Sequence, residues 1–104
     1  MSWFRRRPAD IIGRWKLDPA DTGAAAAFGE VVMEFDDLGN LNYTIFEGSK
    51  AQLMLMTYRL EEGAIVTDQP SDPRPERTPM TLSSDGILTL WSGGEPSRWV
   101  RVED

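Results

Sequence analysis

The chain has 104 residues, with 11 Lys and Arg, 17 Asp and Glu, and neither His nor Cys, so its formal net charge at pH 7 is −6. A chain of this length and ordinary hydrophobic content predicts one small globular domain over residues 1–104. The lack of His and Cys excludes Ser-His-Asp and Cys-His nucleophile systems, the usual zinc sites, iron–sulfur clusters and disulfides. We therefore expect no cofactor, no metal site and no catalytic residue. The acidic balance also argues against nucleic-acid binding, which needs clustered cations.

The N-terminal segment, residues 1–12, carries three consecutive arginines at 5–7. An export signal would continue with about 7–15 apolar residues, whereas Pro, Ala and Asp occupy positions 8–10. We therefore expect a cytoplasmic protein. Stable anchoring at a bilayer takes more than one signal, so we expect no stable membrane association. Residues 8–12 are compatible with one helical turn, and the segment is expected to pack on the domain.

Short runs rich in Val, Ile, Thr and aromatic residues follow, separated by Gly, Asp, Asn and Pro at fairly regular intervals. This pattern is typical of an all-β protein. It predicts eight short strands, at residues 14–18, 30–36, 41–47, 51–61, 64–68, 77–83, 87–91 and 97–103.

Alternation of apolar and polar residues assigns one face of the first three strands to the interior. The fourth strand, 51–61, is apolar on both faces, so the pattern alone leaves its phase open; we favour Met54, Met56 and Tyr58 inward. The inward residues predicted elsewhere are Trp15, Leu17, Val31, Met33, Phe35, Leu41, Tyr43, Ile45, Met80, Leu82, Leu88 and Leu90.

The connections are predicted to alternate in length. Residues 37–40, 61–63 and 84–86 have the Gly and Asn of tight hairpin turns, whereas 19–29, 48–50, 69–76 and 92–96 are expected to be looser. In an up-and-down antiparallel meander, alternate connections lie at opposite ends, so one end would be sealed and the other open. Closure into a barrel would remove both free edges and leave an interior that is either filled or able to hold one small ligand.

The Gly13-Arg14-Trp15 sequence at the start of the first strand resembles the Gly-x-Trp opening of the lipocalin and calycin superfamily. The resemblance implies that Trp15 lies near the closed end, covered by an arginine from the last strand, with Arg101 or Arg98 in that role. It also implies that 19–29 is a lid over the open mouth. Because the chain stops at residue 104, after its last strand, it is most similar to abbreviated lipocalin-like domains of bacteria.

A ligand in such a barrel would contact the inward residues near the mouth. Methionine adapts well to irregular ligands, and we expect a polar ligand group to be directed at Arg77. A solid core is the alternative. The residues predicted to bind a ligand are Leu17, Phe28, Val31, Met33, Ile45, Met54, Met56, Met80, Arg74 and Arg77.

The segment 67–78 combines three prolines with Arg74 and Arg77. Proline limits the conformations of the loop, so the two arginines could receive a carboxylate or phosphate. Alternatively, they pair with the acids of the same segment, Asp68, Asp72 and Glu76. This rigid loop would also suit a protein partner.

Three functions remain from these observations. The first is binding of a small apolar or amphipathic ligand, and the second is a protein interaction module or inhibitor that uses the rim loops. The third, an enzyme using carboxylates in the barrel, lacks support because the predicted inner face contains no Asp or Glu. A homodimer is also plausible, since Val32 and Phe46 are predicted to form an apolar stripe on the outer surface.

Overall fold

The computed structural model describes residues 11–71 and 73–102, so the expectations for 1–10 lie outside the described part of the chain. The described residues form eight strands and one helix; the strands agree with the predicted ones to within one or two residues at their ends, whereas the helix is not predicted. The elements are β1 (Gly13–Leu17), α1 (Thr22–Phe28), β2 (Glu30–Phe35), β3 (Asn40–Glu47), β4 (Lys50–Glu61), β5 (Ala64–Asp68), β6 (Glu76–Leu82), β7 (Leu88–Ser92) and β8 (Glu95–Arg101).

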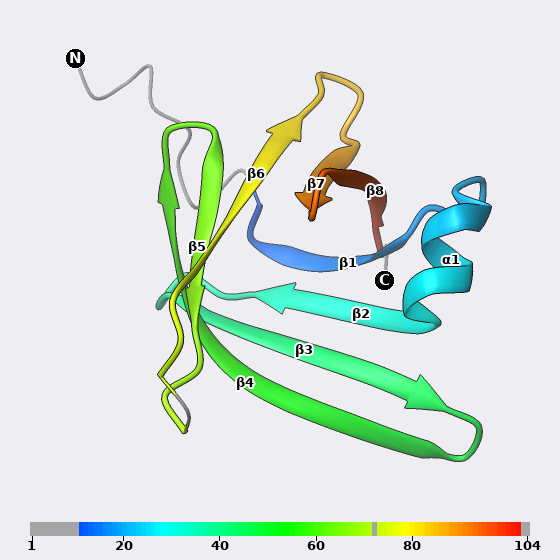
Figure 1. Ribbon diagram of the computed structural model, residues 1–104, viewed down its shortest axis with the longest axis horizontal. Coiled ribbons are helices and arrows are strands. Elements are labelled where there is room, and N and C mark those ends of the chain that lie inside the picture. Colours follow the sequence, from blue (N-terminus) through cyan, green and yellow to red (C-terminus); the bar gives the residue numbers. More distant parts are fainter. Residues whose placement is uncertain (1–10, 72, 103–104) are drawn as a thin grey trace.

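The strands follow one another around a closed antiparallel barrel (Figure 1). β1 completes the ring by pairing with both β2 and β8, with Trp15 opposite Met33 on one side and Arg101 on the other. Closure gives each described strand two hydrogen-bonded neighbours, which removes the exposed edges that invite aggregation. The predicted fold class, an up-and-down β-barrel, is therefore confirmed.

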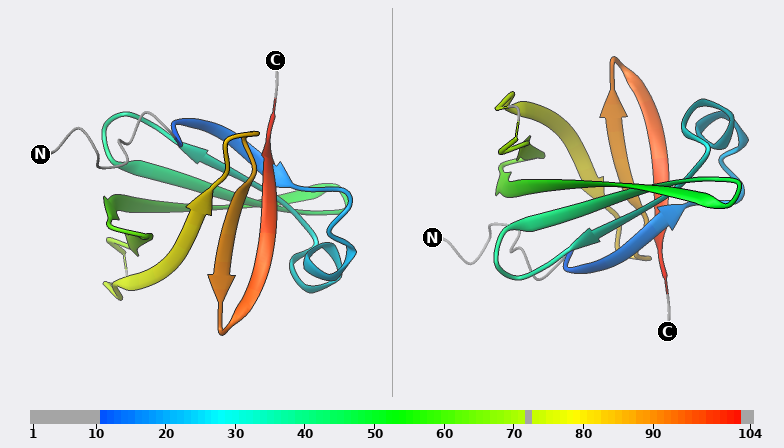
Figure 2. Two further views of the ribbon diagram at one scale, coloured as in Figure 1. Left: turned by 90° about the horizontal axis from the view of Figure 1, so that it is seen from above. Right: turned by 90° about the horizontal axis from the view of Figure 1, so that it is seen from below.

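The phase of β4 is also confirmed. Tyr43 faces Met54 and Leu41 faces Met56 across the β3–β4 pair, and opposed residues on antiparallel strands project from the same face. The alternate residues Leu53 and Leu55 therefore point outward, with 56% and 61% of their surface exposed. β3 and β4 form a long hairpin that projects toward the end of the barrel where α1 lies (Figures 1 and 2).

One end of the barrel is packed around Trp15, which is completely buried. The Trp15 Nε1–H group donates to the Ile11 carbonyl at 2.8 Å. The Arg101 guanidinium lies over the indole, 4.4 Å from the ring centroid, and donates through Nη1 to the Ile12 carbonyl at 2.6 Å. Of the two candidate arginines, Arg101 is the one that covers Trp15, because the odd-numbered residues of β8 face inward.

Gly13 allows this close approach. Its φ is +126°, a conformation that side chains rarely adopt, and an added Cβ would lie 2.7 Å from Arg101 Nη1. Gly13 therefore allows both the backbone conformation at the start of β1 and the close approach of the Arg101 side chain.

The first connection is not the unstructured loop that the sequence predicts. Residues 22–28 form α1, which Asp21 caps by accepting a hydrogen bond from the Ala24 amide at 3.2 Å. Gly29, with a φ of 72°, ends the helix. A capping Asp, a run of alanines with high helix propensity and a terminating Gly together explain the helix. The helical turn expected at 8–12 lies mostly outside the described residues; Ile11 is in a turn.

Two of the connections expected to be loose are tight. Residues 48–49 and 93–94 are two-residue turns between adjoining strands. Gly48, Gly93 and Gly94 have positive φ angles, which short hairpin turns require. The end of the barrel that carries α1 is therefore bounded by one helix, the longer connection between β5 and β6, and two tight turns.

Candidate functional site

The barrel contains a cavity of about 440 Å³. This volume is within the common range for small-molecule sites, roughly 300–1,000 Å³. The interior is therefore only partly filled by side chains. The residues that line the cavity are Phe28, Met33, Phe35, Leu41, Tyr43, Ile45, Met54, Met56, Ile65, Thr67, Glu76, Thr78, Leu90, Ser92, Ser97 and Trp99.

The exposed fractions of the lining residues show which end of the cavity is buried and which end faces solvent. Phe35 and Trp99, with 1% and 2% of their surface exposed, belong to the floor. Glu76, Ser92 and Phe28 are exposed and belong to the rim. A bound molecule would therefore place one end against buried aromatic rings and the other near solvent.

The two sides of the cavity differ in polarity. The side formed by α1 and β2–β4 is apolar apart from Tyr43, and it includes Met54 and Met56. The side formed by β5–β8 provides the hydroxyl groups of Thr67, Thr78, Ser92 and Ser97 and the carboxylate of Glu76. This division suits a molecule that has both an apolar body and hydrogen-bonding groups.

The buried polar groups of the cavity wall are held in fixed positions. Ser97, 3% exposed, accepts a hydrogen bond from Trp99 Nε1 at 3.0 Å and donates to the Leu90 carbonyl at 3.4 Å. Burial raises the pKa of Tyr43, so its phenol is neutral at pH 7. Tyr43 therefore adds a hydrogen-bonding group to the wall but no charge.

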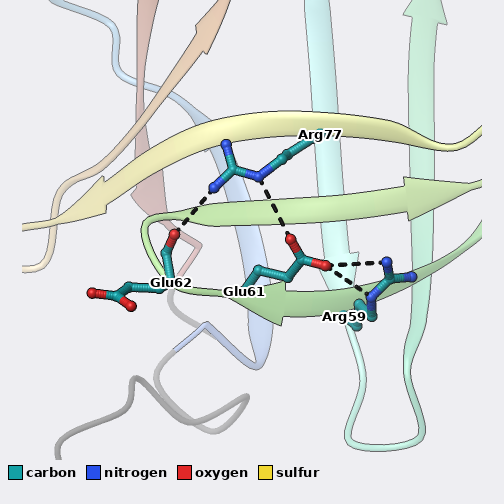
Figure 3. A network of polar contacts seen from close by, with 4 residues as sticks. All are labelled: Arg59, Glu61, Glu62 and Arg77. Atoms are coloured by element: carbon teal, nitrogen blue, oxygen red, sulfur yellow. Dashed lines mark hydrogen bonds and ion pairs between the residues drawn. The ribbon is translucent and has the colours of Figure 1, made fainter.

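The charged residue of the cavity is Glu76, and the expectation that Arg77 faces the ligand is wrong. Glu76 pairs with Thr67 and Thr78 with Ile65, both of which line the cavity, so the intervening Arg77 projects outside. There its Nε lies 3.5 Å from Glu61 Oε1, and its Nη2 donates to the Glu62 carbonyl at 3.2 Å (Figure 3). Because the Glu76 side chain lines the cavity, the prediction that the inner face contains no Asp or Glu is also wrong.

Five of the predicted ligand residues line the cavity: Phe28, Met33, Ile45, Met54 and Met56. The other five do not: Val31 and Met80 belong to the buried core, Leu17 packs against it, and the two arginines, Arg74 and Arg77, are not among the lining residues. Arg74 is exposed, and its backbone amide donates to Asp68 Oδ1 at 2.8 Å.

The predicted ligand residues do not include the hydroxyl-bearing side of the cavity. Strict alternation from Met80 back along β6 reaches Thr78 and Glu76, so the signal was present in the sequence. Thr67 and Ser97 belong to segments in which apolar and polar residues do not alternate clearly. Only the pairing of their strands with the neighbouring strands shows that they face inward.

The helix α1 borders the mouth and is tied to the barrel. Asp21 Oδ2 accepts a hydrogen bond from the Arg98 backbone amide of β8 at 3.0 Å. These two backbone hydrogen bonds, first from Arg98 and then from Ala24, hold the pKa of Asp21 below its usual value. Phe28, at the other end of the helix, lines the cavity. The helix thus has a fixed end at Asp21 and an aromatic residue, Phe28, at the rim of the cavity.

A second feature lies on the outer surface of β3 and β4. Leu53 and Leu55 are more than half exposed, and Phe46, opposite Ala51, is 39% exposed. Val32 of β2 is half-buried on the same face, opposite Thr44. We call Phe46, Leu53 and Leu55 the outer apolar patch.

Within residues 11–71 and 73–102, no group of three or more acidic residues is placed to hold a metal ion, and no helix is long and apolar enough to cross a bilayer. Comparison with protein families, with curated proteins and with solved structures gives no match to this chain.

Proposed function

We propose that this protein binds a small apolar or amphipathic molecule inside its barrel. The observation that carries the proposal is the cavity of about 440 Å³ with a buried aromatic floor and a solvent-facing rim. The interior of a small eight-stranded barrel is narrow enough for its inward side chains to fill it completely. A cavity of this volume leaves apolar surface without packing partners, which costs stability unless a ligand covers it.

The architecture supports the proposal in a second way. Trp15, Gly13 and Arg101 close the opposite end, so a ligand would enter beside α1. The fold and this closed end are consistent with the lipocalin-like resemblance, whose members carry ligands in the barrel. Because three methionines, Met33, Met54 and Met56, border the cavity, its walls can adapt to ligands of different shape.

The proposal is tested with N-phenyl-1-naphthylamine, a neutral dye whose emission increases in apolar surroundings. We expect the wild-type protein to bind the dye at one site. Thr78→Trp would fill the cavity and abolish binding, whereas Thr81→Trp, exposed on the outer face of the same strand, would leave binding unchanged. Equal binding by both variants, with thermal melting showing that both are folded, would reject the barrel as the binding site.

The outer apolar patch supports a second candidate function, self-association. Three large apolar side chains on one strand pair are unfavourable in water, and association would cover them. Because the barrel has no free strand edge in its described part, contact would occur between sheet faces. Sedimentation at two protein concentrations is the test: a dimer that Leu55→Glu dissociates supports this candidate, and a monomer at both concentrations rejects it.

A further inference from the structure

The charged groups around the cavity indicate what charge a ligand should carry. This inference rests on the proposed function, which is binding of a small molecule in the barrel. Among the described residues that line the cavity, Glu76 is the one with an acidic side chain, and none is Lys or Arg. The other polar side-chain groups of the wall are uncharged hydroxyls and the indole N–H group of Trp99. We propose that the ligand is a cationic amphiphile, with an apolar body on the aromatic floor and an amine at the rim beside Glu76.

The position of Glu76 fits a group that meets the polar end of a ligand. It is the first residue of β6 and is exposed at the mouth, so its carboxylate keeps its hydration until a ligand arrives. Thr67 lies opposite Glu76 on β5, and Thr78 follows on the same face of β6. An ammonium group has three donors, and a carboxylate with neighbouring hydroxyl oxygens can accept them.

The neighbouring Arg77 is directed away from the cavity and does not form an ion pair with Glu76. Arg77 is held outside the barrel by the Glu61 carboxylate and the Glu62 carbonyl (Figure 3). In the described part of the chain, no Lys or Arg lies within ion-pair distance of the Glu76 carboxylate. An anionic ligand, such as a fatty acid, would bring its carboxylate to the same rim and meet a like charge there.

The depth of the cavity explains why the cation belongs at the rim and not at the floor. The floor consists of Phe35, Trp99 and other apolar side chains that are almost completely buried. A charge placed there would lose its hydration without gaining a partner of opposite sign. An amphiphile therefore has one favourable orientation, with its apolar end inward.

The test compares three ligands that share a ten-carbon chain: decylamine, decanol and decanoate, each measured by isothermal titration calorimetry at pH 7. Decanol reports on the cavity alone, because it carries no charge. We expect decylamine to bind most tightly and decanoate most weakly, with a difference of about 3- to 10-fold between the amine and the alcohol, the size expected for a partly exposed ion pair.

Two variants separate the role of Glu76 from the general negative charge of the protein. Glu76→Gln should lower the affinity for decylamine to about the affinity for decanol. Glu76→Lys should reverse the order of affinities, so that decanoate binds most tightly. Glu62→Gln changes the net charge equally at a turn outside the cavity and should leave the order unchanged. Both substituted positions are exposed, so the variants should remain folded.

The outcomes distinguish the two proposals. If decanol binds as tightly as decylamine, or if Glu76→Gln still prefers decylamine, the proposal of a cationic ligand is overturned. The proposal that the cavity binds a ligand would stand in both cases. Failure of all three ligands to bind the wild-type protein would overturn both. The predicted order, lost only in the Glu76 variants, would support the cationic amphiphile.

Discussion

Asp21 joins α1 to the last strand of the barrel by accepting a hydrogen bond from the backbone amide of Arg98, 77 residues away, at 3.0 Å. The other oxygen of the same carboxylate caps α1. One side chain therefore fixes both the start of the helix and its place against β8. Because Phe28 at the end of this helix borders the cavity, the contact also determines how the mouth is covered.

Asp21→Ala should loosen α1 while leaving the barrel folded. Both hydrogen bonds are lost, so the backbone amides of Ala24 and Arg98 should exchange faster with solvent deuterium, and bound dye should dissociate faster. Asp37→Ala, at an exposed turn, is the matched control. Unchanged exchange at Arg98 in Asp21→Ala would show that other contacts hold the helix.

Acid should weaken the fold through two carboxylates. Backbone hydrogen bonds from Arg98 and Ala24 lower the pKa of Asp21, and hydrogen bonds from Asn40 lower that of Asp36, both from an ordinary value of 3.8. Folding thus favours the ionised forms. The stabilisation is fully present above pH 3.8 and is lost as pH falls through the lower pKa values of the folded protein.

Thermal melting from pH 7 to pH 2 measures this dependence. The loss of stability below pH 3.8 should be smaller in Asp21→Asn and Asp36→Asn, because neither substituted side chain titrates. A variant with the same acid dependence as the wild-type protein would rule out that carboxylate as a contributor.

Gly13→Ala should destabilise the protein by about 2–4 kcal/mol, because strain at a φ of +126° adds to a contact of 2.7 Å with Arg101 Nη1. Gly48→Ala is the control, with a positive φ but open space around its Cβ position. Its expected cost is about 1–2 kcal/mol. Urea unfolding of the two variants compares them, and equal losses would mean that the Arg101 contact adds nothing.

Arg101→Ala should cost about 1–2 kcal/mol, since it removes the cation–π contact with Trp15 and the hydrogen bond to the Ile12 carbonyl. Arg98→Ala keeps the backbone amide that Asp21 uses and should change stability little. Chemical denaturation distinguishes the two arginines. A larger loss for Arg98→Ala would contradict the arrangement at the closed end.

Local sequence patterns predict most of the barrel because its strands are short and sequential. Alternation in β2 places Val31, Met33 and Phe35 inward, and the structure agrees. Alternation fails in β4, where Leu53 to Met56 are all apolar, and the pairing of Tyr43 with Met54 resolves the phase. Where a strand is apolar on both faces, its own pattern does not specify which residues face inward or how it pairs with its neighbour.

The errors concern the mouth of the barrel. The sequence interpretation assigned Arg77 to the ligand because a proline-rich loop was expected to extend up to it, whereas β6 begins one residue earlier and turns Glu76 inward. The helix α1 is absent from the sequence prediction, although Asp21, the alanine run and Gly29 are local helix signals. Which inward side chains leave a cavity depends on packing among all eight strands, and no local pattern contains that information.

The central claim is that a ligand enters the barrel, and the methyl resonances of the methionines test it directly. Met33, Met54 and Met56 line the cavity, whereas Met80 is buried in the core outside it and serves as an internal control. During titration with decanol, followed by NMR, the account predicts saturable shifts of the first three methyl signals and little change at Met80. No shift at Met54 and Met56, or shifts confined to Leu53 and Leu55 on the outer surface, would contradict it.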